Sequence, residues 1–291
     1  MWACARGSRA LALAAGLALT APAVAADLPL SAAGAGPQPA RVVSINLCTD
    51  QLAMALAAPG QLVSVSWLAA DPRSSAMADA AAAYPQNRGG AEEVFLLAPD
   101  LVLAGTFTAR ATVDLLRRLG VAVVELPPVA GIDGIPAQIL VVGRALGRPD
   151  AAQAMADRFV ADLARLRAAG VVPMPAAIYH PNGYTTGAGT LADDILTAAG
   201  FRNAGAEAGV TGGGILPLER LVMAAPRMIV TSAPYPGASR SEEILAHPAL
   251  AALRGRTGAA RIADADWVCG TPAVLRALAD LVAARRALGA P

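Results

Sequence analysis

The sequence predicts an α/β fold in which two Rossmann-like lobes are joined by one long helix. Short β-rich runs alternate with helical stretches from Arg41 onward, which is the pattern of α/β layering. A helical stretch over residues 150–169 interrupts this alternation in the middle of the chain. One short sequence element occurs once on each side of that stretch. Hydrophobic residues make up 55% of the 291 residues, so the chain can bury a large core.

The first half of the regular region is expected to hold four strands, because four short apolar runs are separated by turn and helix signals. These strands are predicted at residues 41–45, 62–66, 101–104 and 121–126. Thr49 and Thr108 are expected to act as N-caps of two intervening helices, and Gly120 to end the second of them. A further short helix is expected over 91–97, where Pro99 stops it.

Two helices are then expected in succession, over 135–146 and 150–169. Apolar residues recur at helical spacing in the longer one, and its length of about 30 Å suits a stiff connection between two lobes. The alternation restarts after it, with strands expected at 176–179, at 228–231 and around Ile262. Further helices are expected to begin at Thr190, at Leu218 and at Thr271.

The repeated element runs from Glu92 to Pro99 and again from Glu219 to Pro226. In both copies an acid stands seven residues before a proline, a short helix is expected between them, and an apolar strand follows. A single copy is common in α/β proteins. Two copies, one on each side of a long helix, indicate two lobes of like design.

The N-terminus has the pattern of an export signal. Arg6 and Arg9 precede an apolar run over 10–19, and small residues follow at Ala25 and Ala26. We expect a signal peptide over 1–26, cleaved near Ala25 or Ala26, with an uncleaved anchor as the alternative. The remaining boundaries are then a flexible leader over 27–40, an N-terminal lobe over 41–148, the connecting helix over 149–170, and a C-terminal lobe over 171–291.

Composition narrows the range of partners. The formal net charge is +1, which gives no reason to expect a nucleic-acid partner. No run of about 18 apolar residues follows the signal segment, so no membrane span is expected in the mature chain. The chain has only two histidines, too few for a site that binds a bare transition-metal ion with several imidazoles.

The order and spacing of these elements resemble the periplasmic binding proteins for vitamin B12 and ferric siderophores, over roughly residues 41–288. The resemblance implies a class III solute-binding protein of the helical-backbone type, without enzymatic activity and without a resident cofactor. It implies a periplasmic monomer that captures a cobalamin, another corrinoid or a ferric siderophore, so that the Co or Fe belongs to the ligand. The implied partner is the permease dimer of an ABC importer in the inner membrane. A haem carrier on the same fold is an alternative.

The resemblance also assigns a role to the repeated acids. In the family, one exposed glutamate on each lobe pairs with arginines of the permease, and Glu92 and Glu219 match those positions. The alternative is that each is a helix-start acid favoured by the helix dipole. Glu93 adjoins Glu92 and leaves the first assignment uncertain by one residue.

The ligand is expected between the lobes, against loops at the carboxyl ends of strands. Arg88 lies before the first repeated element, where the family often has a ligand contact. Aromatic residues are only 4% of the chain, so those in predicted loops are informative, with core packing as the alternative. The expected ligand contacts are Cys48, Thr49, Asp50, Trp67, Leu68, Arg88, Thr106, Phe107, Tyr184, Thr185, Asp266, Trp267 and Cys269.

Three residues carry competing interpretations. Cys48 is a small buried hydrophobe, a disulfide partner of Cys269 across the mouth of the cleft, or a contact to the ligand. His180 is an axial ligand to haem or cobalt, or an ordinary loop residue. A secreted hydrolase would need Cys48, His180 and Asp50 as nucleophile, base and acid, but the chain has no Gly-x-Ser-x-Gly motif.

Overall fold

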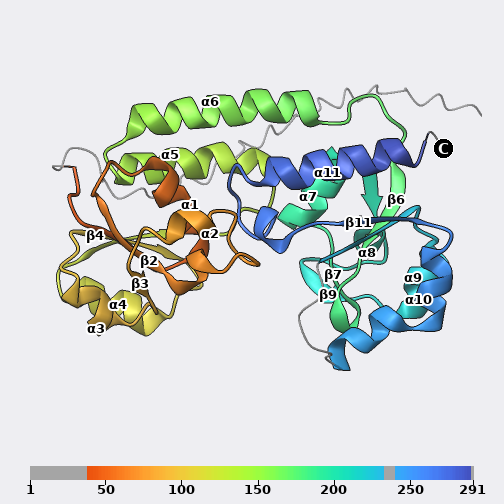
Figure 1. Ribbon diagram of the computed structural model, residues 1–291, viewed down its shortest axis with the longest axis horizontal. Coiled ribbons are helices and arrows are strands. Elements are labelled where there is room, and N and C mark those ends of the chain that lie inside the picture. Colours follow the sequence, from red (N-terminus) through yellow and green to blue (C-terminus); the bar gives the residue numbers. More distant parts are fainter. Residues whose placement is uncertain (1–37, 233–239, 290–291) are drawn as a thin grey trace, which may run out of the picture. The chain divides into compact units, whose positions relative to one another are not determined.

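The computed structural model describes residues 38–232 and 240–289 (Figure 1). The predicted signal peptide and most of the predicted leader lie outside the described residues. The N-terminal half contains a parallel sheet with the strand order β3-β2-β1-β4-β5. Its strands are β1 (Val42–Ser44), β2 (Leu62–Ser66), β3 (Gln86–Asn87), β4 (Leu101–Gly105) and β5 (Ala122–Leu126).

The C-terminal half contains a second parallel sheet, with the order β11-β10-β6-β8. Its strands are β6 (Met174–Ile178), β8 (Phe201–Asn203), β10 (Met228–Thr231) and β11 (Gly258–Arg261). A small antiparallel pair, β7 (Tyr184–Thr186) and β9 (Gly213–Ile215), stands apart from it. The two parallel sheets confirm the predicted α/β class.

Helices alternate with these strands along the chain. In the N-terminal half they are α1 (Leu47–Leu56), α2 (Ala78–Ala81), α3 (Ala91–Leu96), α4 (Arg110–Arg118) and α5 (Ile135–Ala145). The helix α6 (Pro149–Leu166) separates the halves in sequence, and α7 (Leu191–Ala198), α8 (Ala204–Glu207), α9 (Leu218–Ala224), α10 (Pro248–Arg254) and α11 (Val274–Ala287) follow it. Among the described residues, no helix is both long enough and apolar enough to cross a bilayer.

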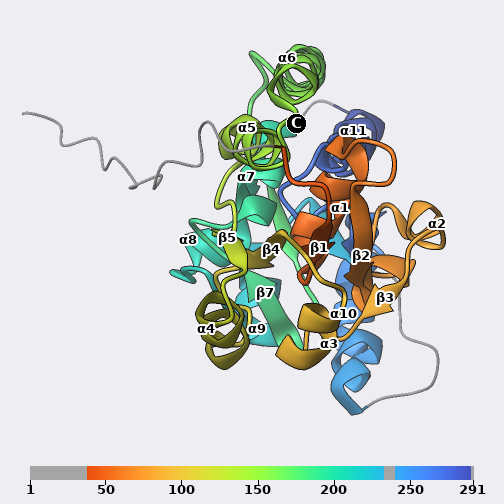
Figure 2. The same cartoon turned by 90° about the vertical axis from the view of Figure 1, so that its left-hand side faces the viewer.

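Alternate residues of the central strands point to opposite faces of the sheet and pack in separate hydrophobic clusters. Val42 of β1 and Leu103 of β4 pack in the cluster that contains residues of α1 and α5. Their neighbours Val43 and Val102 face the other way and pack with Val94 of α3 and with residues of α4. Figure 2 shows α3 and α4 on the side of this sheet that lies away from α5 and α6.

The second sheet repeats this arrangement. Met228 of β10 packs in the cluster that contains residues of α7 and α11, whereas the next residue, Ile229, packs with Leu221 of α9 and with residues of α10. The helices α3 and α9, which carry the two copies of the repeated element, therefore cover corresponding faces of their sheets.

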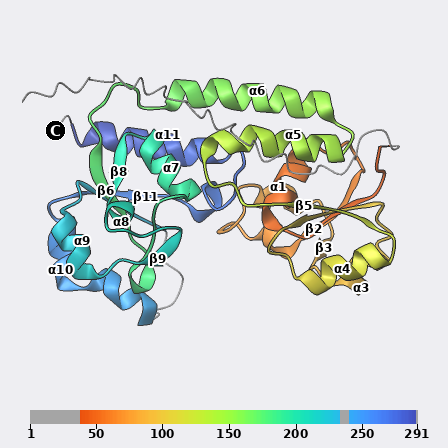
Figure 3. The ribbon, with the colours of Figure 1, turned by 180° about the vertical axis from the view of Figure 1, so that it is seen from behind.

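The predicted long helix is α6, which begins at Pro149 and ends at Leu166. It packs on α5 of the N-terminal half and on α11 of the C-terminal half, and Figures 1 and 3 show it lying along both. Its buried side includes Ala152 and Phe159. A Cβ atom on Gly143 of α5 would lie 2.1 Å from that of Ala152, so glycine permits the close approach of these helices. The role of α6 as the connection between lobes, and the predicted lobe boundaries, stay predictions.

Two of the predicted N-caps are wrong. Asn46, not Thr49, caps α1, because its side chain accepts hydrogen bonds from the backbone N–H groups of Cys48 and Thr49. Ala109 stands at the N-cap of α4, and Thr108 Oγ1 instead accepts from the N–H of Gly105. Both predictions placed the helix start at a residue type that favours N-caps. The sequence alone does not show where the preceding strand ends, so the start was misplaced.

The predicted cap at Thr190 is confirmed, since Thr190 Oγ1 accepts from the N–H of Asp193 at 3.2 Å. The last helix begins at Val274 rather than at Thr271. The last strand ends at Arg261, one residue before the expected Ile262. Strands β3, β7, β8 and β9 were not predicted, because runs of two or three residues carry no clear period.

Candidate ligand-binding site

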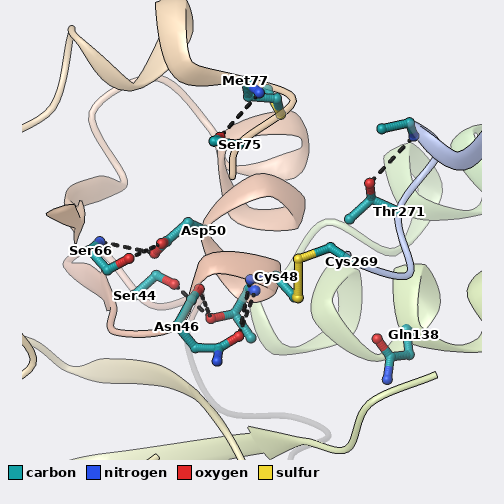
Figure 4. Close-up of a disulfide and its surroundings, with 12 residues drawn as sticks. Ser44, Asn46, Cys48, Asp50, Ser66, Ser75, Met77, Gln138, Cys269 and Thr271 are labelled. Carbon is teal, nitrogen blue, oxygen red and sulfur yellow. Dashed lines mark hydrogen bonds between the residues drawn. A yellow bond between two sulfur atoms is a disulfide. The ribbon is translucent and has the colours of Figure 1, made fainter. Parts of the chain in front are cut away.

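A disulfide joins the two halves of the chain. Cys48 in the first turn of α1 is bonded to Cys269 in the segment before α11, with the Cα atoms 5.2 Å apart and a sequence separation of 221 (Figure 4). Of the three interpretations of Cys48, the bridge is the one confirmed. Neither sulfur is then a free thiolate, which removes both the direct contact to a metal and the cysteine nucleophile of the hydrolase alternative.

A pocket of about 230 Å³ lies beside this disulfide and is lined from both halves. It brings together the predicted contacts Cys48, Thr106 and Phe107 with Val268, which adjoins Cys269. Phe107 is 86% exposed, so its ring projects into open space rather than into the core. The remaining lining residues are Asn46, Thr49, Leu52, Gly105, Leu126, Pro127, Pro128, Val129, Gln138, Leu191 and Gly270.

Thr49 and Asp50 are both held by internal hydrogen bonds, although Thr49 also lies in the pocket wall and Asp50 does not. Both are buried, because Asn46 caps the helix and turns its first residues toward the sheet. Thr49 Oγ1 bonds to Ser44 Oγ at 2.7 Å, and Asp50 accepts from Ser66 Oγ at 2.5 Å and from Ser66 N–H at 3.1 Å. Figure 4 shows the Asp50 carboxylate directed at Ser66, away from the disulfide. The Asp50 side chain is therefore not a ligand contact, whereas Thr49 stays a candidate.

The other predicted contacts of the N-terminal half lie outside the pocket. Trp67 and Leu68 occupy a short 3₁₀ turn directly after β2, and the Trp67 side chain is half exposed. The Arg88 side chain is exposed, and its backbone N–H donates to a carboxylate oxygen of Glu93 at 2.8 Å. These residues are accessible to a large ligand, but the structure does not bring them to the pocket wall.

Thr185 and Tyr184 have different positions although they are neighbours in β7. Thr185 is fully buried and its hydroxyl donates to the carbonyl of Ile178, so it too is no longer a ligand candidate. Tyr184 points the other way, as the alternation of a strand requires, and is 43% exposed. A Cβ atom on Gly213 would lie 2.0 Å from the Tyr184 hydroxyl, so the ring needs a glycine beneath it.

His180, Ser232 and Asp264 form a hydrogen-bonded chain in the C-terminal half. The Ser232 hydroxyl donates to Asp264 Oδ1 at 2.5 Å, and its oxygen lies 3.0 Å from His180 Nδ1. The Ser232 hydroxyl has one proton, which it shares with Asp264, so it can only accept a hydrogen bond from His180. We therefore assign the proton of a neutral His180 to Nδ1, which donates to Ser232, so that Nε2 is unprotonated and has no hydrogen-bond partner among the residues that the structure describes.

Burial of His180 favours the uncharged form of its ring. Burial lowers the pKa of His180 from its usual value, and the nearby Asp264 carboxylate offsets part of this effect. The Tyr184 ring lies 6.2 Å away, and the Trp267 ring 6.3 Å away in an edge-on arrangement. Trp267 is only 7% exposed, so it packs as a wall beside the imidazole instead of standing in open space.

The sequence pointed to the wrong aspartate. Asp266 is bound by the guanidinium of Arg276 in α11, whereas Asp264 accepts from Ser232 and lies 3.4 Å from Trp267 Nε1. Ser232 follows β10 directly, and Asp264 comes three residues after the end of β11. Ligands of α/β proteins bind at the carboxyl ends of strands. Examining the residues after each strand of the second half would therefore have found both residues.

Glu92 and Glu219 occupy the first turns of α3 and α9, and both are exposed. Glu93 is engaged locally through the Arg88 N–H. Glu92 makes no hydrogen bond or ion pair with another described residue, which favours it over Glu93 as the acid available to a partner.

Comparison with known proteins decides the family. A family model described as periplasmic binding protein matches residues 42–257. The chain belongs to this family. No curated protein matches the chain, so the comparison with individual periplasmic binding proteins rests on solved structures.

Several solved structures share this periplasmic binding protein fold. The periplasmic heme-binding protein RhuT from Roseiflexus sp. RS-1 superposes with a TM-score of 0.70 at 23% identity, covering 85% of this chain and 98% of that one. A periplasmic heme-binding protein from Pseudomonas aeruginosa gives 0.67 at 23%, covering 87% and 94%. The vitamin B12 binding protein BtuF of Vibrio cholerae gives 0.65 at 19%, covering 86% and 98%. At these identities the likeness establishes the fold.

Proposed function

We propose that this chain is the substrate-binding component of an ABC importer, which captures a metal chelate between its two halves and delivers it to a permease dimer in the inner membrane. Membership of the periplasmic binding protein family and a pocket lined from both halves support this proposal. Export to the periplasm as a monomer, and a carrier role without catalysis, are parts of it.

The unprotonated Nε2 of His180 carries the proposal on ligand class. A neutral imidazole whose Nδ1–H is held by Ser232 presents one lone pair, which suits an axial position of a metal. A ferric siderophore that fills all six positions of its iron would leave this group unused. A porphyrin leaves both axial positions open, and its flat ring suits the exposed aromatic rings of Phe107 and Tyr184. Haem is therefore the ligand we favour, with corrinoids next and siderophores last.

Titration with haemin, cyanocobalamin and the hydroxamate siderophore ferrichrome tests this order. We expect haemin to bind with a shifted Soret band, and His180→Ala to weaken binding about 10- to 100-fold and alter the spectrum. His247→Ala is the matched control, because His247 is the only other histidine and it is an exposed helix cap. Tight binding of ferrichrome without binding of haemin would contradict the axial role and restore the siderophore.

The docking role of the two acids is tested by charge reversal. We expect Glu92→Arg with Glu219→Arg to abolish uptake and leave ligand affinity unchanged, because both side chains are exposed on α3 and α9. Asp150→Arg with Asp280→Arg makes the same change in charge at exposed acids of α6 and α11, and should preserve uptake. Loss of ligand binding in the first pair, or equal loss of uptake in the control pair, would contradict docking.

A further inference from the structure

The two copies of the repeated element expose apolar side chains at the same positions. Four residues after each acid stand Leu96 and Met223, which are 83% and 81% exposed. Three residues after each acid stand Phe95 and Val222, which are 43% and 39% exposed. A single exposed hydrophobic residue is ordinary on a protein surface. The same two positions, exposed to nearly the same degree in two separate halves, are not explained by chance placement.

The local backbone is also similar in both copies. Val94 and Leu221, two residues after each acid, are fully buried and anchor their helices to the sheet. Ala98 and Ala225, each directly before the proline, adopt left-handed conformations with φ of 48° and 41°. This conformation costs an alanine about 1–2 kcal/mol, and in both copies it stands within two residues of the last helical residue, Leu96 of α3 or Ala224 of α9. The acid and the exposed apolar pair therefore have the same relative placement in each half.

A partner that reads both copies must itself offer the same surface twice. A two-fold symmetric dimer does this, because its subunits present identical patches related by the symmetry axis. Glu92 and Glu219 make no hydrogen bond or ion pair with other residues that the structure describes, so a complementary patch carries a basic group. Beside each acid, the exposed apolar pair calls for a hydrophobic socket.

We propose that Leu96 and Met223, flanked by Phe95 and Val222, are two equivalent apolar anchors that enter hydrophobic sockets on the two halves of the permease dimer. This proposal rests on the proposed importer function, and it gives the glutamates and the apolar anchors different roles in docking. The glutamates steer and orient the complex through charges that salt screens. The anchors supply affinity by burying surface that is exposed in the free protein.

Binding to the importer tests the anchors. The permease–ATPase complex of the source organism is purified in lipid nanodiscs, and its dissociation constant is measured for the wild type and variants. Leu96→Ser and Met223→Ser should each weaken binding about 10-fold, and the double variant about 100-fold. The loss should be the same at low and high NaCl, whereas Glu92→Gln with Glu219→Gln should reduce the salt dependence itself. Val172→Ser is the control, because Val172 is 67% exposed but lies outside the repeated element.

Each outcome separates the anchors from the docking proposal. An unchanged dissociation constant in the double serine variant, with binding abolished by Glu92→Arg and Glu219→Arg, would overturn the anchors and leave docking intact. If neither pair of substitutions weakens binding, both proposals fail. An effect at Leu96 but none at Met223 would overturn the two-fold arrangement. An unchanged thermal midpoint and unchanged haemin binding in the serine variants confirm that any loss arises at the surface.

Discussion

Each half of the molecule contains a serine–aspartate pair at the carboxyl end of a parallel sheet, and the two pairs have different environments. Ser66 ends β2 and donates to Asp50, while Ser232 follows β10 and donates to Asp264, both at 2.5 Å. Asp50 is fully buried, and burial raises its pKa to about 6. The second pair continues to His180, whose ring is only partly buried.

The difference shows that hydrogen-bond chemistry alone does not make a binding site. In the first pair the backbone N–H of Ser66 also donates to Asp50, so the carboxylate is satisfied internally and presents nothing to a ligand. In the second pair the hydrogen-bonded chain ends at an imidazole whose Nε2 has no partner among the described residues. The disulfide joins the two regions, since Cys48 lies two residues before Asp50 and Cys269 lies five after Asp264.

Removing the disulfide that joins the two regions should have the largest effect on the free energy of unfolding. Closing a loop of 221 residues stabilises a folded chain by about 5 kcal/mol in the chain-entropy model. We expect Cys48→Ala with Cys269→Ala to lower the free energy of unfolding by about 2–5 kcal/mol in guanidinium titrations. Wild-type protein treated with reductant should match the variant. A loss below about 1 kcal/mol would show that the two regions hold together without the bridge.

The buried carboxylate should produce the next largest effect, seen as a dependence of stability on pH. Asp50 has a pKa of about 6 in the folded protein, against about 3.9 in an unfolded chain. Between these values the folded state binds more protons than the unfolded state. The Asp50 contribution to the free energy of unfolding therefore falls by about 3 kcal/mol as pH rises from about 4 to about 6, and is constant above that.

Asp50→Asn isolates this contribution, because other carboxylates also titrate in the same range. The difference in unfolding free energy between wild type and variant, measured from pH 4 to pH 7.5, should change by about 3 kcal/mol. A constant difference for Asp50→Asn would mean that the carboxylate is not buried as described.

The smallest effect concerns Asp264 as a positioning residue for His180. Asp264→Asn keeps the shape of the side chain but removes the charge that offsets the burial of the imidazole. We expect haemin affinity to fall about 10-fold, with the unfolding free energy nearly unchanged. Because the pKa of His180 falls further in this variant, the loss of haemin binding on acidification should move to lower pH. Asp266→Asn is the control, and an identical pH profile in both variants would remove the role of Asp264.

The elements that the sequence predicted well are those set by neighbours along the chain. The apolar spacing of α6, the cap of α7 at Thr190 and the two copies of the repeated element depend on residues within a few positions of each other. Exposed positions such as Phe107 and Tyr184 could be proposed from their place after strands. The sequence predicts the start of α1 three residues too late, because nothing local distinguishes Asn46 from Thr49 as its cap.

The sequence by itself determined the α/β alternation, the long helix and the matched acids, because period and capping act over a few residues. Only the tertiary structure decided that Cys48 meets Cys269, that Asp264 rather than Asp266 supports His180, and that Asp50 is sealed in the core. These are choices among side chains of the same type. Each is settled by which distant strand or helix packs against it, and that depends on the fold as a whole.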